Sequence, residues 1–293
     1  MTVVSPKELH DALIMKRVKD HYDEALLHFP KEQIVGVFLQ GSQNYELDYE
    51  GSDVDTKLIV VPSFKDICLN RKPISTTYVR ANNEHTDWKD VRLYMETFRK
   101  QNLNFLEILF TPYYIVNPMY EAEWNRLVAA REQIARMNPH RAVKSMKGIA
   151  MEKYHAMEHR YPAKVDIIDK YGYDGKQVSH LDRVDDYLER YIFGTPYEEC
   201  LIPTPERKPR MMDYKMLDRI PLEHARVEAK KILDHVVFTA DFFCERVPEE
   251  EDPAMRELLE DVSYNIMKIA VEYELGVQEP EITYDHETLG GYV

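Results

Sequence analysis

Two aspartates separated by one residue, Asp53 and Asp55, are the side chains in this sequence best suited to chemistry. They stand just before an apolar run, and Gly41-Ser42 ends the preceding apolar run. Side chains two residues apart in a strand share one face, so Asp53, Asp55 and Lys57 are expected to point the same way. Ionised carboxylates beside buried strands are costly without partners. The pattern therefore predicts a cation site at this strand end.

The expected cation is Mg²⁺ or Mn²⁺. Hard divalent ions bind one or two carboxylates together with phosphate oxygens of a substrate. A pair of such ions roughly 3.5–4 Å apart can activate an attacking oxygen and stabilise a leaving one. Gly41 and Ser42 at a strand end allow backbone amides and a hydroxyl to approach a phosphate closely. Together with Asp53 and Asp55 they predict a site for a nucleoside triphosphate.

The hydrophobic pattern predicts the elements that position these residues. Apolar runs over residues 34–39 and 57–62 are expected to be central strands. A hairpin is expected to follow, with a tight turn at residues 81–83. Helical spacing then places Val91, Tyr94, Met95 and Phe98 on one face, and Asp90 is the expected cap.

From about Tyr120 onward the hydrophobic period is near 3.6, which favours helices. We therefore expect an α+β protein: a mixed-sheet domain over residues 1–118, a helical domain over 119–277 and a polar tail over 278–293. No apolar stretch reaches the roughly eighteen residues of a membrane span. Three cysteines without C-x-x-C spacing favour neither disulfides nor a zinc ribbon, and a cytoplasmic location is expected.

The net charge of -14 disfavours a broad, nonspecific grip on nucleic acid. Residues 126–160 are nevertheless basic, with eight Lys or Arg against three Glu. This segment is either a solvated helix face or a wall that faces phosphates.

Three segments resemble a known family. "GSQNYELDYEGSDVD" has the Gly-Ser and Asp-x-Asp motif of the nucleotidyltransferase superfamily that includes DNA polymerase β. "DWKDVRLYMETFRKQNLNFLEILFTPYYIVNP" is similar to the helix and N-x-x-x-L-E-x-L-F-T/S-P block of its RNA-repair-pathway polymerase β branch, which occurs in bacteria and phages. "YGYDGKQVSHLDRV" resembles that branch's G-Y-D-x-K-x-x-x-H-x-x-R element. The resemblance covers roughly residues 33–230.

The resemblance implies a nucleotidyltransferase core followed by a helical domain. It implies transfer of a nucleoside monophosphate, from ATP or another triphosphate, to an acceptor hydroxyl with release of pyrophosphate. Asp53 and Asp55 match the metal-binding aspartates. A third carboxylate on a neighbouring strand would contact the catalytic metal and help to deprotonate the acceptor. Asp87 is the chosen candidate; Asp90 and Glu84 are the alternatives.

A helix that begins near Gly175 would place Lys176, His180 and Arg183 on one stripe. Such a stripe could bind phosphates across the cleft. The alternative is an exposed face whose cations pair with nearby acidic residues. Those residues are Asp182, Asp185 and Asp186.

Two other functions remain open. The run His155–His159 matches the zinc-peptidase pattern H-x-x-E-H, with His155, Glu158 and His159 as its characteristic residues and both histidines on one helical face. A binding module of the same fold without catalysis is the other alternative. The acceptor is an RNA or tRNA end, a protein side chain or a small molecule, with RNA preferred. The oligomeric state is left open.

Overall fold

The structure, a computed structural model, describes residues 5–217 and 219–277. Its centre is a five-stranded sheet in the order β3-β4-β2-β1-β5. Strands β2 and β4 are parallel, whereas the other neighbouring pairs are antiparallel. The mixed α+β class is thus confirmed. The strands are β1 (Ile34–Gln40), β2 (Asp55–Val60), β3 (Ser75–Val79), β4 (His85–Asp90) and β5 (Tyr114–Val116).

Helices surround this sheet, and short 3-10 turns join several of them. The first group is α1 (Pro6–Ala25), η1 (Lys31–Gln33), η2 (Ser42–Tyr45), α2 (Phe64–Cys68), α3 (Val91–Arg99), α4 (Leu103–Leu106), η3 (Glu107–Leu109), η4 (Pro118–Tyr120), α5 (Glu121–Ala129) and α6 (Arg131–Ala135). The second group is α7 (Pro139–Ala156), η5 (Pro162–Lys164), α8 (Val165–Tyr171), α9 (Gly175–Ile192), α10 (Tyr197–Leu201), α11 (Lys208–Lys215), α12 (Leu222–Cys244) and α13 (Pro253–Glu274). None of the described helices is long and apolar enough to cross a membrane.

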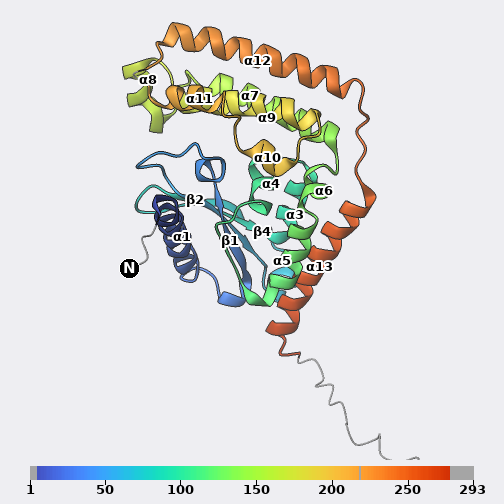
Figure 1. Cartoon of the computed structure of the whole chain (residues 1–293). Helices are drawn as coiled ribbons and strands as arrows, with labels where there is room; N and C mark the ends of the chain where they lie inside the picture. Colours follow the sequence, from blue (N-terminus) through green and yellow to red (C-terminus); the bar gives the residue numbers. More distant parts are fainter. Residues whose placement is uncertain (1–4, 218, 278–293) are drawn as a thin grey trace, which may run out of the picture.

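The sheet separates two apolar layers (Figure 1). Helix α1 covers one face, where Ile14 and Val18 pack with Val37 and Leu58. The other face packs against α3, α5 and α13. A register shift in β1 between Ile34 and Gly36 changes the alternation of its side chains. Strand β2 keeps a period of two, which directs its odd-numbered side chains away from α1.

The predicted local structures are present. Residues 75–90 form the antiparallel hairpin of β3 and β4. Helix α3 buries the four expected apolar side chains, and Asp90 caps it by accepting a hydrogen bond from the Arg92 N–H at 2.9 Å. The Asp90 interpretation as a helix cap is therefore confirmed.

Helices α5 and α13 return to the sheet domain from beyond residue 118. The ring centroids of Phe38 in β1 and Trp124 in α5 lie 4.1 Å apart. Helix α13 packs along α5 and α3, and Arg99 forms an ion pair at 2.8 Å with Glu251, just before α13. The expected division at residue 118 passes through this shared apolar core. The expected tail over residues 278–293 lies outside the described residues.

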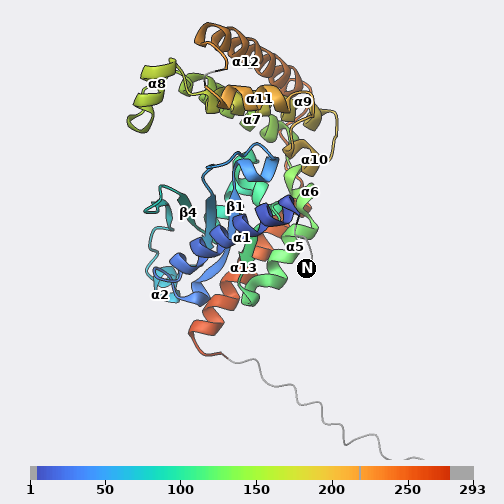
Figure 2. The same ribbon diagram turned by 60° about the vertical axis from the view of Figure 1, so that its left-hand side comes forward.

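A layer of helices lies over the end of the sheet where β1 ends and β2 begins (Figures 1 and 2). Helix α9 is central to it and packs against α7, α11 and α12. Its three aspartates are buried and face α10–α12 as well as Arg190 of their own helix. The pairs are Asp182 with Arg210, Asp185 with Arg207 and His235, and Asp186 with Arg190. The alternative in which these aspartates pair with Lys176, His180 and Arg183 is therefore wrong, because the acids are buried and paired with other side chains.

Gly175, the first residue of α9, has no room for a side chain. A Cβ atom there would lie 1.8 Å from the main-chain oxygen of Tyr214 in α11. We expect Gly175→Ala to lower the free energy of unfolding by on the order of 3 kcal/mol, because backbone must move. Gly148→Ala in α7 is the matched control, since nothing lies within 4 Å of its Cβ position; it should stabilise by up to about 1 kcal/mol. Urea denaturation measures both, and equal effects would contradict the tight α9–α11 contact.

Candidate active site

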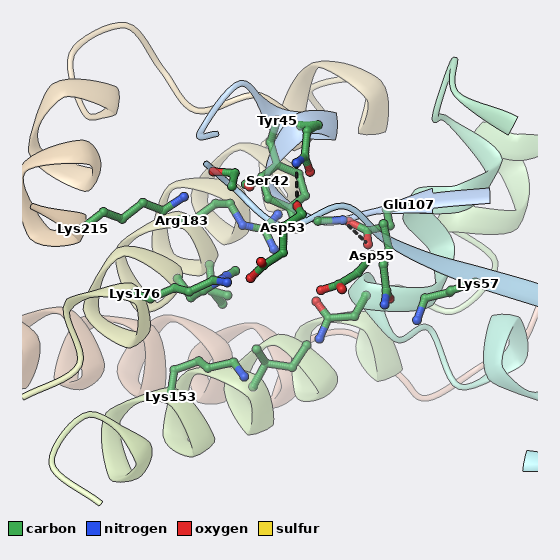
Figure 3. Close-up of a pocket in the computed structure, with 18 of the residues that line it drawn as sticks. Ser42, Tyr45, Asp53, Asp55, Lys57, Glu107, Lys153, Lys176, Arg183 and Lys215 are labelled. Atoms are coloured by element: carbon green, nitrogen blue, oxygen red, sulfur yellow. Dashed lines mark hydrogen bonds between the residues drawn. The ribbon is translucent and has the colours of Figure 1, made fainter. Parts of the chain in front are cut away.

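A cavity of about 420 Å³ lies between the end of the sheet and helices α7, α9 and α11 (Figure 3). Every site residue predicted from the sequence lines it. These residues are Gly41, Ser42, Asp53, Asp55, Lys57, Asp87, Lys176, His180 and Arg183. The tertiary structure thus brings together three segments that are far apart in the chain.

The two aspartates of the Asp-x-Asp motif point into this cavity from the start of β2 (Figure 3). Asp55 is the first residue of the strand, and its Oδ1 accepts a hydrogen bond from the His85 N–H at 2.8 Å. Asp53 lies before the strand and its side chain is exposed. Its main-chain oxygen accepts a hydrogen bond from Gln43 Nε2 at 2.7 Å. The Asp53 carboxylate therefore keeps its oxygens for a ligand.

Asp87 lines the same cavity from β4, but its carboxylate has partners in the protein. It lies opposite Lys57 in the parallel β2–β4 ladder, and Lys57 Nζ is 3.2 Å from Asp87 Oδ2. The Thr77 hydroxyl donates to Asp87 Oδ1 at 2.7 Å. Burial raises the pKa of Asp87, but Lys57 and Thr77 outweigh burial and leave the pKa below its ordinary value.

Glu84 lies on the other face of β4 and does not line the cavity. Its carboxylate is buried against α1, where it accepts from Arg17 and His21 and from the Val54 N–H. Arg80 also contacts it. Glu84 is therefore a structural residue, on the face opposite to Asp87 as the strand pattern predicts.

Within residues 5–217 and 219–277, no three side chains of the His, Cys, Asp or Glu type are grouped closely enough to hold a metal ion by themselves. Asp53 and Asp55 still supply a suitable donor set for Mg²⁺, which commonly takes one or two carboxylates and completes its shell with water and substrate phosphates. The residues therefore fit a divalent ion that arrives with a substrate better than one held by protein alone.

The wall opposite the aspartates is cationic (Figure 3). Lys153 in α7, Lys176 and Arg183 in α9, and Lys215 in α11 all line the cavity. Burial, together with the charges of Lys176 and Arg183, lowers the pKa of Lys215 to about 8. Burial and the same group of cations also hold the pKa of His180 well below its ordinary value. Crowded positive charges of this kind favour an anionic ligand.

Glu107 is a buried carboxyl at the base of the cavity, and its side chain was given no role by the sequence. It is the acidic residue within the apolar run of residues 105–110. Burial raises its pKa to about 7, although the charges of Arg183 and Lys57 oppose that rise. Its Oε1 accepts a hydrogen bond from the Gly41 N–H at 3.3 Å. The feature of the sequence that could have identified Glu107 as a site residue is its position as the single carboxylate in an apolar run.

The Gly41–Tyr45 turn is fixed from several sides. Gly41 has φ of 106°, a region open mainly to glycine, and it precedes a 3-10 turn. The Asn44 side chain donates to Leu39 O at 3.1 Å and accepts from the Thr111 hydroxyl at 2.6 Å. The Gly41 N–H is thus used by Glu107, and it is the Ser42 hydroxyl that remains for a phosphate.

The zinc-peptidase pattern does not form a site. Helix α7 ends at Ala156, so His155 is helical whereas His159 is not, and the expected shared helical face is wrong. Glu158 forms an ion pair with Arg226 at 2.7 Å.

The basic segment over residues 126–160 is mostly paired with acidic side chains. Arg126, for example, pairs with Asp261 at 2.6 Å, and Lys147 pairs with Asp241 at the same distance. Arg141 pairs with Glu249 at 3.2 Å. From this segment only Lys153 and the apolar Ile149 line the described cavity. Ion pairs with acidic side chains occupy most of the cations of this segment, so the segment as a whole is not a wall that faces phosphates.

Comparisons with known proteins leave the family open. No protein-family model matches the sequence, and no curated protein matches it significantly. The resemblance to RNA-repair-pathway polymerase β proteins therefore remains an expectation from the motifs quoted above.

The raised pKa of Glu107 predicts a pH-dependent stability. Because its folded pKa of about 7 exceeds the ordinary 4.5, the protonated form stabilises the fold fully below pH 4.5, and this contribution is lost as pH rises through 7. Glu107→Gln cannot titrate. The free energy of unfolding of Glu107→Gln relative to that of wild type should therefore rise by about 2.5 kcal/mol between pH 5 and pH 8. Denaturant midpoints at both pH values measure the difference; parallel curves for the two proteins would contradict it.

Proposed function

We propose that this chain is a metal-dependent nucleotidyltransferase. It transfers a nucleoside monophosphate from a nucleoside triphosphate to an acceptor hydroxyl, with an RNA or tRNA end as the first acceptor to test, and releases pyrophosphate. The observation that supports this most strongly is the division of charge across one cavity. Asp53 and Asp55 face a group of cations that come from three helices. A polyanion with a bound divalent cation would complement both walls, because the cation binds the aspartates and the anion binds the lysine and arginine side chains.

The proposed reaction is an in-line displacement at phosphorus. The acceptor oxygen forms a bond to the α-phosphorus, and the bond from that phosphorus to the bridging oxygen breaks. Pyrophosphate leaves with the bonding electrons, and the acceptor proton passes to water or a nearby base. Positioning and charge stabilisation provide most of the catalysis in such reactions. Lys176, Arg183 and Lys215 lie where they can neutralise the leaving phosphates.

Asp53 and Asp55 would hold the metal. A bound divalent ion supplies charge stabilisation at the phosphate oxygens. Asp87 is the proposed base, but its lowered pKa makes it a weak one while Lys57 is paired with it. Transfer of Lys57 from Asp87 to a phosphate of the substrate would restore the basicity of Asp87. Lys57 would then serve first as the ion-pair partner of Asp87 and afterwards as a phosphate contact, in two stages of one cycle.

A binding module without catalysis is the second candidate. The observation that favours it is the engagement of both Asp87 oxygens by Lys57 and Thr77. Such a protein would bind the triphosphate and transfer nothing. Incubation with each α-labelled ribonucleoside triphosphate, Mg²⁺ or Mn²⁺, and either total RNA or protein lysate separates the two. Label in a macromolecule supports transfer and identifies the acceptor class.

Asp53→Asn and Asp55→Asn should each reduce transfer by on the order of 100-fold or more, because each removes a charge that holds the metal. Both variants should remain folded, since neither carboxylate is buried. The wild type should gain about 2.7 kcal/mol from Mg²⁺ and triphosphate at a hundred times the dissociation constant. Labelled product and thermal melting are the measurements. Full activity in Asp53→Asn would exclude the mechanism.

Lys153→Ala and Lys176→Ala should raise the KM for the triphosphate by about tenfold each, because each loses one charge-assisted contact with a phosphate. Their Mg²⁺ requirement should stay unchanged. Lys144→Ala is the matched control: Lys144 is exposed on the same helix as Lys153 and does not line the cavity. Initial rates over a range of triphosphate concentrations measure the effect. An equal rise in KM for Lys144→Ala would show that only overall charge matters.

A further inference from the structure

A buried carboxyl and a buried guanidinium share the candidate cavity without pairing. Glu107 is 3% exposed and Arg183 is 2% exposed. Among the described residues, Glu107 Oε2 and the Nε and Nη1 atoms of Arg183 have no hydrogen-bond partner, and Arg183 forms no ion pair within 4.0 Å. Buried ionisable groups without partners cost folding free energy, so a ligand is expected to supply their missing hydrogen bonds.

Tyr45 lies between these two side chains. The Arg183 Cζ atom is 3.9 Å from the centroid of the Tyr45 ring, within the range of a cation–π contact. The Tyr45 hydroxyl and the Glu107 carboxyl are close enough to affect each other: Tyr45 lowers the pKa of Glu107, and Glu107 raises the pKa of Tyr45. Glu107 therefore acts on the ring that supports Arg183, and its charge also attracts the guanidinium.

Glu107 also holds the glycine-serine turn. Its Oε1 accepts from the Gly41 N–H, and the turn continues through Ser42 to Tyr45. One carboxyl thus contacts both the first residue and the last residue of this turn. The Ser42 hydroxyl and the Arg183 guanidinium, which line the cavity from different domains, are both positioned through it.

We propose that Glu107 is a positioning residue for a polyphosphate site: through Tyr45 and Gly41 it holds Arg183 and Ser42 apart and directed at the phosphate chain of the ligand. An unrestrained guanidinium in this cavity would pair with Asp53 or Asp55, since Arg–carboxylate pairs are strong. Such a pair would block both the anion and the cation site. The inference rests on the proposed function for the class of ligand, and it assigns a role to a residue outside the predicted site.

Two physical effects of Glu107 on anion binding have opposite signs. A negative charge near a phosphate chain weakens binding, so its removal alone would tighten binding. Loss of positioning would weaken binding. Glu107→Ala removes both the charge and the hydrogen bonds, whereas Glu107→Gln removes the charge and keeps an oxygen that can accept from the Gly41 N–H.

The test is titration calorimetry of the full chain with inorganic tripolyphosphate in the absence of divalent metal. We expect Glu107→Ala to weaken binding about tenfold and Glu107→Gln to restore it to within about threefold of wild type. In an Arg183→Ala background, Glu107→Ala should change affinity less than about twofold, because the group that it positions is gone. Unchanged or tighter binding by Glu107→Ala, or equal effects in both backgrounds, would overturn the proposal.

Tyr45→Phe provides a second route if Glu107→Ala fails to fold. It keeps the ring under Arg183 and removes the hydroxyl that contacts Glu107, so it should weaken tripolyphosphate binding severalfold; wild-type affinity would count against the proposal. A wild type that does not bind tripolyphosphate overturns the inference. If the wild type binds with the expected coupling but transfers no nucleotide in the labelling assay, the proposed transferase activity fails and the role of Glu107 stands.

Discussion

The hydrogen-bonded connection between the Gly41–Tyr45 turn and the segment 107–111 is the constraint on which the cavity depends. Glu107 accepts from the Gly41 N–H, and Thr111 donates to Asn44 in the same turn. Gln43 then donates to the main chain of Asp53. A segment after α4 thereby fixes the end of β1, and through it the start of β2. Without this connection Asp53 would lose the support of its loop, whereas strand pairing would still hold Asp55.

Charge separation across the cavity follows from how each wall is built. The sheet places Asp55 at a strand end, where the His85 N–H donates to its carboxylate at 2.8 Å and the His85 ring nitrogen Nδ1 lies 3.4 Å from the same oxygen. On the helical side, the buried aspartates of α9 are paired outside the cavity, whereas Lys176 and Arg183 line it. Asp182, for example, pairs with Arg210, and the next residue, Arg183, lines the cavity. The buried aspartates of α9 therefore anchor the helix, and its cations Lys176 and Arg183 are the candidate ligand-binding residues.

Three residues that line the cavity have buried polar atoms without a hydrogen-bond partner among the described residues, as do several residues elsewhere in the fold. Glu107, Arg183 and Gln43 each retain a buried polar atom without a partner. Such groups reduce stability, and natural proteins retain them mainly where a ligand or a function compensates. The buried cluster around Glu84, which lies on the other face of the sheet, is instead well paired with Arg17, His21 and Arg80. The contrast separates a structural carboxylate from a candidate functional one.

Local pattern alone predicted the strands around Asp53 and Asp55, the capped helix α3 and the start of α9 near Gly175, because strand and helix periodicity and capping depend on neighbours in the chain. It also predicted which face of β4 holds Asp87 and which holds Glu84. Only the tertiary structure showed that Lys57 pairs with Asp87, that Lys153 and Lys215 join the cationic wall, and that Glu107 shares the cavity with Tyr45. These contacts join residues 30 to more than 100 positions apart, and nothing in local periodicity encodes the packing of α7, α9 and α11 over the strand ends.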